Sequence, residues 1–295
     1  KIKLVRIACH INEIKEAIKS IRWLKQKKFI VGLNLMQISN YDKKMRNKIS
    51  KLISKEKIDV VYLADSLGTL KEDNIKDIII DFKKNCDQHI GIHTHDNMGR
   101  AISNTILAIN SGASWVDSTV LGMGRGPGNA KTELLLLELS NHKKNFFSQV
   151  DLISLINDYF NDLHTKYNWG TNIYYYLSGL YKIHPTYIQE LLNDKSHTKD
   201  EIINIINHLK DLESKKFNPE NLFSAKFFFQ GKTKGKWSPA KFLKSREILL
   251  IGPGLNIEKK IDEIEDYIKK KKPLVFVLNT NKVIRSNLVD VRIAC

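Results

Sequence analysis

The sequence predicts an α/β fold in which parallel strands alternate with helices along the first half of the chain. Apolar runs of strand length alternate with stretches whose apolar residues recur at helical spacing. Short polar motifs follow several of the strand-like runs, as they do where the carboxyl ends of parallel strands share one edge of a sheet. A chain of 295 residues with 42% hydrophobic residues is long enough for one large barrel or for two domains.

The first 120 residues alternate strictly between the two kinds of element. Strands are expected at residues 3–9, 29–38, 58–64, 91–95 and 115–120. Helices are expected at residues 11–25, 42–53 and 71–85, with a fourth between Gly99 and Ser111. Because neighbouring parallel strands require a crossover, this order predicts a parallel sheet. The sequence supplies five βα units, and a complete barrel has eight.

A histidine pair ends the fourth expected strand, in the run His93-Thr94-His95. Side chains two residues apart on a strand point to the same face, so both imidazoles can reach one point. Imidazole is the commonest neutral ligand of divalent metals. After the fifth strand comes a glycine-dense loop, residues 122–129, which allows close approach of the backbone to a ligand and ends at Asn129. The predicted metal-binding residues are therefore His93, His95 and Asn129.

Four further residues lie at the ends of expected strands. Asp65 and Ser66 follow the third strand, where they could orient the metal ligands or the substrate. Arg6 and His10 lie near the same edge of the sheet. His10 could act as an acid or a base, or it could simply complete a hydrogen-bond network. These four residues are the candidate catalytic set.

Taken together, these motifs resemble the signature of the metal-dependent lyase and aldolase superfamily with a pyruvate carboxyltransferase-type domain. It includes hydroxymethylglutaryl-CoA lyase, isopropylmalate synthase and 4-hydroxy-2-oxovalerate aldolase. The matching positions are residues 93–97, Asn104, Ala108, Gly112, Ala113, residues 116–118 and residues 122–129.

The resemblance implies a partial TIM barrel that lacks its first strands. In that comparison, residues 6–10 correspond to the third barrel strand, the Asp65-Ser66 motif to the fifth and the histidine pair to the sixth. The family's first strand carries an Asp that binds the metal and an Arg that supports the enolate, and this sequence has no such motif. We therefore expect a segment of a longer protein, inactive as it stands, in preference to an altered family member.

The resemblance also implies the chemistry. We expect a divalent-metal-dependent aldolase that cleaves a 4-hydroxy-2-oxo acid into pyruvate and an aldehyde, or forms it from them. Without clustered thiolates, Mn²⁺ or Mg²⁺ is favoured over a closed zinc site. The ion would act as a Lewis acid on the 2-oxo acid. Two alternatives stay open: an acyl-CoA Claisen-type synthase or lyase of the same superfamily, and a non-catalytic barrel that serves as a scaffold.

Three structured segments and a linker are expected along the chain. The barrel occupies residues 1–145, and a helical segment behind it occupies residues 146–214, with helices at 134–139 and 150–163 flanking the boundary. In such relatives a tyrosine from this segment can enter the active site, and here Tyr174, Tyr175 and Tyr176 are candidates. A polar linker is expected at residues 215–245. A strand, helix and strand within residues 246–295 resemble the start of a Rossmann-like domain.

The composition limits the partners. The formal charge of +16 comes from 48 basic and 32 acidic residues, but the lysine runs lack interleaved aromatics and are read as solvated faces, so nucleic acid is not expected. Three widely spaced cysteines indicate a reducing compartment, the cytoplasm. No apolar run reaches the roughly 20 residues of a membrane span. The expected partners are a small 2-oxo acid and, beyond it, a second copy of the chain or a partner dehydrogenase.

Overall fold

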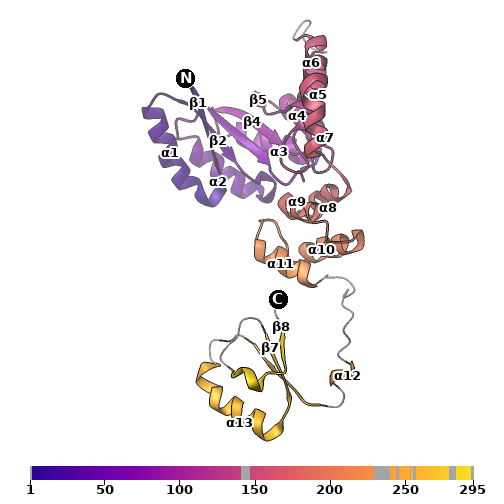
Figure 1. Cartoon of the computed structure of the whole chain (residues 1–295). Helices are drawn as coiled ribbons and strands as arrows, with labels where there is room; N and C mark the ends of the chain where they lie inside the picture. The colour runs from indigo at the N-terminus through magenta and orange to yellow at the C-terminus, as the bar shows by residue number, and fades with distance from the viewer. Residues whose placement is uncertain are drawn as a thin grey trace. The chain divides into compact units, whose positions relative to one another are not determined.

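The computed structural model describes residues 2–140, 147–228, 240–243, 246–252, 254, 257–278 and 284–293 (Figure 1). The chain divides into two compact units, Lys1–Gly231 and Lys232–Cys295. Each unit is described by itself.

A parallel sheet of five strands forms the centre of the first unit. The strands are β1 (Leu4–Cys9), β2 (Ile30–Leu35), β3 (Val60–Asp65), β4 (His89–Thr94) and β5 (Trp115–Val116), and they lie in sequence order. The register pairs Cys9 with Leu35 and Asp65 with Thr94, so the carboxyl ends of the strands lie along one edge. This arrangement confirms the predicted fold class, an α/β protein with a partial TIM barrel.

Four helices connect the successive strands: α1 (Ile14–Gln26), α2 (Lys43–Ile53), α3 (Glu72–Lys83) and α4 (Ala101–Asn110). Each has an apolar stripe, which in α1 runs from Ile14 through Ile18 and Ile21. These stripes join β1 to β4 in one buried cluster, and Figure 1 shows α1, α2 and α3 packed along the sheet. The Asp42 carboxylate accepts from the Met45 N–H at 2.7 Å, which caps α2 at the predicted start.

The fifth strand is shorter than predicted. It covers two residues, whereas the sequence indicated residues 115–120. The Asp117 N–H still donates to the Ile92 carbonyl, but beyond it the chain turns into the short helix η3 (Val120–Gly122), where Leu121 has a positive φ of 51°. Thr119 forms a bridge with Lys131 instead of continuing the ladder. Trp115 and Val116 pair with β4, and none of residues 115–120 is fully buried, so the apolar residues of this run do not mark the length of the strand.

A helical segment follows the sheet within the same unit. Its helices are α5 (Thr132–Ser140), α6 (Gln149–Leu155), η4 (Ile156–Phe160), α7 (Asn161–Tyr167), α8 (Ile173–Tyr181), α9 (Pro185–Asn193), α10 (Lys199–Asp211) and α11 (Pro219–Phe228). The Ser148 hydroxyl accepts from the Asp151 N–H at 3.2 Å, so Ser148 caps the helical stretch that the sequence predicted at residues 150–163. The last four helices enclose a core of their own around Tyr187, Leu191 and Ile205.

The polar linker predicted at residues 215–245 is wrong in its first part, because α11 lies within it. Leu222 and Ala225 on this helix are buried in the core of α8 to α11. The Asn218 N–H donates to the Tyr187 hydroxyl at 2.8 Å and so fixes the approach to the helix. The glycines and prolines that suggested a linker lie mostly after this helix, and residues 229–239 fall outside the described part of the chain.

The second unit contains a parallel sheet of β6 (Ile248–Ile251), β7 (Leu274–Leu278) and β8 (Val291–Ile293), in that order. The helix α13 (Ile261–Lys271) crosses from β6 to β7, which gives the βαβ unit expected of a Rossmann-like start. The shorter elements are α12 (Ala240–Leu243), η5 (Glu258–Lys260) and η6 (Ser286–Leu288). Within the described ranges of either unit, no helix is both long enough and apolar enough to be a membrane span.

Candidate functional site

A cavity of about 210 Å³ opens at the carboxyl edge of the five-stranded sheet. Its lining comes from residues at and just after the carboxyl ends of β1, β2, β3 and β4, from the glycine loop and from the helical segment. The lining residues are His10, Asn34, Met36, Gln37, Ala64, Ser66, His93, His95, Arg125 and His184. A βα-barrel places its active site at this edge, so the cavity lies where the fold predicts one.

The predicted histidine pair faces this cavity. The ring centroids of His93 and His95 are 5.0 Å apart with an interplanar angle of 77°. Both residues line the cavity, as the spacing of two along β4 requires. The structure therefore brings the two imidazoles together, and their role as metal ligands stays a prediction.

A chain of charged groups holds His93 in place. The His93 Nδ1 lies 2.8 Å from the Asp117 Oδ2, and the Arg6 guanidinium donates to the same carboxylate at 2.8–2.9 Å. Burial opposes ionisation of Asp117, but the hydrogen bond with His93 and the charge of Arg6 lower its pKa below the ordinary value. Because a carboxylate only accepts, His93 donates from Nδ1 and leaves Nε2 for a ligand.

Arg6 acts behind the cavity and does not line it. Its guanidinium carbon lies 3.6 Å from the centroid of the Tyr62 ring, a cation–π contact. Tyr62 in turn meets the edge of Trp115. Arg6 therefore contacts Asp117, which in turn contacts His93, and its catalytic role stays a prediction.

His95 is buried and uncharged near neutral pH. Burial, and then the nearby charges of His93 and Arg125, lower the pKa of His95 to about 3. Its Nδ1 is buried without a hydrogen-bond partner in the described part of the chain. A neutral imidazole with an unsatisfied nitrogen is the form that binds a divalent metal.

The backbone of Asn129 pairs with that of His95. The two residues form an antiparallel bridge, and the Asp96 N–H donates to the Gly128 carbonyl at 3.0 Å. The Asn129 Nδ2 donates to the Met123 carbonyl at 3.2 Å, and its Oδ1 is buried without a described partner. The side chain does not line the first cavity, so the structure places Asn129 next to the histidine pair without directing it at the same space.

His10 and Asn34 enter the cavity with unsatisfied atoms. The His10 Nδ1 and the Asn34 Oδ1 are both buried, and neither has a hydrogen-bond partner among the described residues. A buried polar atom without a partner is unfavourable unless a ligand or water completes it. For His10 this favours a role toward a ligand over a role in a closed hydrogen-bond network.

Asp65 and Ser66 take different positions. The Asp65 carboxylate is fully buried and accepts from the N–H groups of Thr69 and Leu70 at 3.1 and 3.0 Å, so it shapes the loop after β3. Burial raises its pKa to about 6, although these hydrogen bonds act in the opposite direction. The Ser66 hydroxyl lines the cavity and accepts from the Gln37 N–H at 3.0 Å. Of the pair, only Ser66 reaches the cavity directly.

The sequence analysis missed two cavity residues, Arg125 and His184. Arg125 belongs to the glycine loop, where an arginine among glycines was an available signal. His184 is the N-cap of α9 in the helical segment. It lies far from the strands in sequence, so no local pattern predicts that it reaches the cavity. Burial, then the charges of Arg125 and His10, lower the pKa of His184 to about 4.

The helical segment is joined to the sheet edge by hydrogen bonds. The Gln37 Nε2 donates to the Lys215 carbonyl at 3.1 Å, and the Asn97 Nδ2 donates to the Ser178 hydroxyl at 3.1 Å. Tyr175, one of the three tyrosines predicted as candidates, packs on Gly126, and burial raises its pKa to about 12. The described lining of the cavity includes none of those three tyrosines.

The site fits part of a metal-binding set. Among the residues that the structure describes, no group of three or more His, Cys, Asp or Glu side chains could hold a metal ion. His93 and His95 offer two imidazole nitrogens, and the Asn34 Oδ1, which has no described partner, offers an oxygen in the same cavity. The residues present could therefore provide two ligands to a divalent cation, and an oxygen donor lies in the same cavity.

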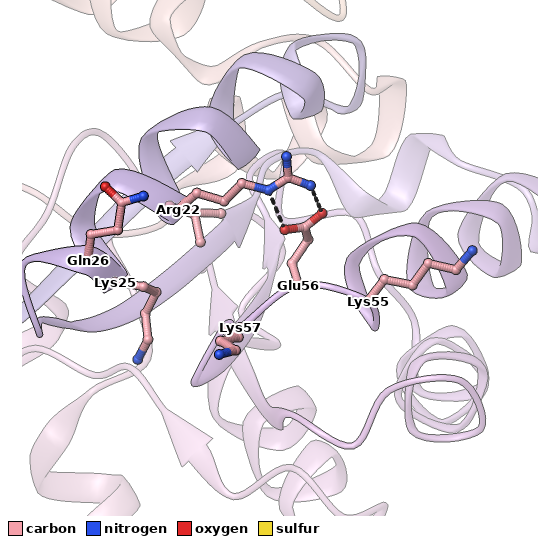
Figure 2. Close-up of a pocket in the computed structure, with 7 residues that line it drawn as sticks. Arg22, Lys25, Gln26, Lys55, Glu56 and Lys57 are labelled. Atoms are coloured by element: carbon pink, nitrogen blue, oxygen red, sulfur yellow. Dashed lines mark hydrogen bonds and ion pairs between the residues drawn. The ribbon is translucent and has the colours of Figure 1, made fainter.

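A larger cavity of about 480 Å³ lies between α1 and the segment before β3. Figure 2 shows the Arg22–Glu56 ion pair at its centre, while Lys25, Lys55 and Lys57 point in different directions. Lys25 also pairs with Asp59 at 2.8 Å. Since these charged groups do not converge, the cavity is a solvated face and not a reaction site.

Comparisons with known proteins agree with this description. The 4-hydroxy-2-oxovalerate aldolase of Carboxydothermus hydrogenoformans is 33% identical over 155 residues, which are 52% of this chain and 45% of that protein. The enzyme of the same name from Geobacillus genomosp. 3 is 41% identical over 91 residues, 31% of this chain and 27% of its own length. The chain therefore spans less than half the length of these curated relatives.

Two solved structures share the fold. The N-terminal domain of a proposed aldolase from Bacteroides vulgatus superposes with a TM-score of 0.59 and 32% identity, covering 65% of this chain and 64% of that one. The carboxyl transferase domain of Rhizobium etli pyruvate carboxylase reaches a TM-score of 0.62 at 15% identity, covering 82% of this chain and 44% of that one, and shows the fold alone. Residues 4–158, just over half of the chain, match the HMGL-like family. The sheet, the histidine pair at its edge and this match together establish that the chain belongs to the HMGL-like family.

Proposed function

We propose that this chain is part of a divalent-metal-dependent aldolase that cleaves a 4-hydroxy-2-oxo acid into pyruvate and an aldehyde. The observation that carries the proposal is the histidine pair, with its rings 5.0 Å apart in a cavity at the carboxyl edge of the sheet. Relatives that bear the name 4-hydroxy-2-oxovalerate aldolase support the substrate class. Because the chain spans less than half of their length, the activity is proposed for the complete protein.

His93, through Nε2, and His95 would hold the metal, Mn²⁺ or Mg²⁺. When bound, the ion would supply Lewis acidity toward the 2-oxo acid. Asp117 and Arg6 hold the His93 ring in one orientation from behind, so the nitrogen that faces the cavity is defined before any ligand arrives.

Arg125 and the unsatisfied groups of the cavity would bind the substrate. A guanidinium pairs with a carboxylate through two parallel hydrogen bonds, so Arg125 is suited to the substrate's carboxylate. Asn34 contributes an amide oxygen that can accept from a hydroxyl group. A volume of about 210 Å³ suits a short-chain acid.

Cleavage of a 4-hydroxy-2-oxo acid requires a base that takes the proton of the 4-hydroxyl group. Two histidines, His10 and His184, line the cavity. Burial lowers the pKa of His184 to about 4, which makes its imidazole a weak base near neutral pH, and its Nδ1 accepts from the Thr186 N–H at 3.4 Å. His10 presents a buried Nδ1 without a described partner to the same space. We assign the base to His10.

The test is turnover by the complete protein before and after treatment with a chelator. We expect pyruvate to form from 4-hydroxy-2-oxovalerate only when Mn²⁺ or Mg²⁺ is present. His95→Ala should abolish this turnover with little change in stability. The control His89→Ala, at the exposed other end of β4, should leave turnover intact. Undiminished rates after chelation, or a lysine adduct trapped by borohydride, would show that the metal-dependent mechanism is wrong.

A further inference from the structure

Among the described residues that line the cavity at the sheet edge, His184 alone comes from the helical segment. It is the N-cap of α9. The proposed reaction assigns the base to His10 and gives His184 no part. The neighbours of His184 in α9 and in the cavity indicate what its ring can do.

The start of α9 fixes the position of the proton on the His184 ring. The Thr186 N–H donates to the His184 Nδ1 at 3.4 Å, so this nitrogen carries no proton. Burial, and then the charges of Arg125 and His10, lower the pKa of His184 to about 4, so the ring is neutral near neutral pH. A neutral imidazole holds one proton. That proton is therefore on Nε2, which makes the Nε2–H a hydrogen-bond donor.

Contacts within the helical segment hold His184 in place. The His184 N–H donates to the Ser214 carbonyl at 2.9 Å, and the rings of His184 and Phe217 lie 6.4 Å apart, centroid to centroid. Gln37, which also lines the cavity, donates to the carbonyl of Lys215, the residue after Ser214. A donor whose position is fixed in advance needs little reorganisation when a ligand binds.

The Nε2–H of His184 has no acceptor in the part of the chain that the structure describes. The described lining contains four histidines and Arg125, and it contains no Asp or Glu. The carboxylates that contact the lining histidines, Asp117 and Glu13, do not themselves line the cavity. An acceptor for the Nε2–H is therefore expected from a ligand, and this lining favours a ligand with anionic oxygens.

We propose that His184 is a catalytic hydrogen-bond donor, whose Nε2–H binds the C2 oxygen of the substrate as that oxygen gains negative charge. This role rests on the proposed aldolase function. In the cleavage, His10 takes the proton of the 4-hydroxyl group, C4 becomes the aldehyde carbon, and the electron pair of the C3–C4 bond passes to C3 and the C2 oxygen. Protonation of C3 by the same His10 then gives pyruvate. A donor that binds the enolate oxygen more strongly than the ketone oxygen lowers the barrier.

Two substitutions separate this role from the capping of α9. His184→Asn keeps a side-chain oxygen for the Thr186 N–H but has no group at the position of Nε2, whereas His184→Gln places an amide N–H near that position and loses the favoured cap. In the complete protein, His184→Asn should lower kcat for 4-hydroxy-2-oxovalerate about 100-fold with little change in KM. His184→Gln should keep kcat within about tenfold of the wild type. Thermal unfolding should show the opposite order, with His184→Asn the more stable variant.

Two measurements test the contact without turnover. Nuclear magnetic resonance of the metal-free complete protein with ¹⁵N-labelled histidine, the His184 signals being assigned by His184→Asn, should show the proton on Nε2. Oxalate carries anionic oxygens in a plane, as the enolate of pyruvate does. In calorimetric titration of the Mn²⁺-loaded protein, His184→Asn should bind oxalate at least about tenfold more weakly than the wild type. His184→Gln should keep most of the affinity.

A proton on Nδ1, wild-type oxalate affinity in His184→Asn, or equal losses of kcat in the two variants would each overturn the role of His184. A wild type with full metal-dependent turnover and an equally active His184→Asn variant would overturn this role alone. A wild type that forms no pyruvate would refute the aldolase function and, with it, the catalytic role of His184.

Discussion

Asp117 decides which nitrogen of His93 is available to a ligand. Its carboxylate lies 2.8 Å from the His93 Nδ1 and is itself held by Arg6. In Asp117→Asn the amide can present its N–H₂ group and no longer fixes the tautomer. We expect Mn²⁺ affinity of the complete protein to fall by about 10- to 100-fold, the usual effect of losing such a partner. Calorimetric titration with Mn²⁺ measures this directly.

Asp77→Asn is the matched control for that experiment, because Asp77 is an exposed carboxylate on α3, away from the cavity. It should bind Mn²⁺ as the wild type does. If Asp117→Asn also bound Mn²⁺ with wild-type affinity, Asp117 would have no part in positioning His93.

His184 makes the stability of the protein depend on pH. Its folded pKa of about 4 lies below the value of about 6.5 in an unfolded chain, so the unfolded state binds more protons between these values. The stability that neutral His184 contributes is therefore present above about pH 6.5 and is lost as the pH falls toward 4. We expect the free energy of unfolding to decrease from pH 7 to pH 5. His184→Gln should remove about 1 kcal/mol of that decrease, after allowance for partial exposure.

Urea unfolding at pH 7 and pH 5 measures this effect in the wild type and the variant. His95, with its folded pKa of about 3, adds to the dependence in the same direction, so His184→Gln should flatten it only in part. The exposed His89 serves as the control in His89→Gln, which should keep the whole dependence. A His184→Gln protein with the full wild-type dependence would contradict the assignment.

At the scale of an element, the glycine loop depends on the absence of a side chain at Gly128. A Cβ there would lie 2.3 Å from the Gly122 carbonyl oxygen, and φ is +78°. Gly99 has a similar φ of +69° with nothing near its Cβ position. Gly99→Ala should therefore cost about 1 kcal/mol of backbone strain, and Gly128→Ala should cost clearly more and displace Asn129. Thermal unfolding of both variants separates the steric clash at Gly128 from the backbone strain that both positions share. Equal losses of stability in the two variants would show that no clash occurs at Gly128.

The helix α11 is part of the core of α8 to α11, although the sequence around it suggested a linker. Leu222 is 7% exposed, and its neighbour Phe223 is 73% exposed. Leu222→Ala should destabilise the protein by about 2–5 kcal/mol, the range for large-to-small changes in a core. Phe223→Ala should stay within about 0.5 kcal/mol of the wild type. Chemical unfolding of the two variants provides the comparison, and similar small losses in both would mean that α11 is not packed.

For the whole molecule, the sequence predicts what local patterns determine. The strands and helices up to α4 follow from apolar periodicity, and α2 begins where expected, after its cap Asp42. The meeting of His93 and His95 follows from their spacing of two on one strand. The length of β5 does not follow, because the chain turns into η3 at Val120 although that residue is apolar.

The rest of the cavity depends on contacts between residues far apart in sequence. Asp117 meets Arg6 across 111 positions, and no local pattern pairs them. His184 enters the cavity because α9 begins there, which is decided by how the helical core packs against the sheet edge. α11 was missed because Pro219 at its start, and Gly231, Gly235 and Pro239 after it, suggested a linker.

The cavity is therefore a joint product of the sheet and the helices behind it. His184 crosses from one to the other, and the bonds from Gln37 to Lys215 and from Asn97 to Ser178 keep the two in register. For protein engineering this sets the smallest exchangeable block. A chimera that grafts only the strands and their crossover helices onto a relative would take its helical segment from that relative, and the two parts would not match. A graft that extends through α11 would carry its own helical segment.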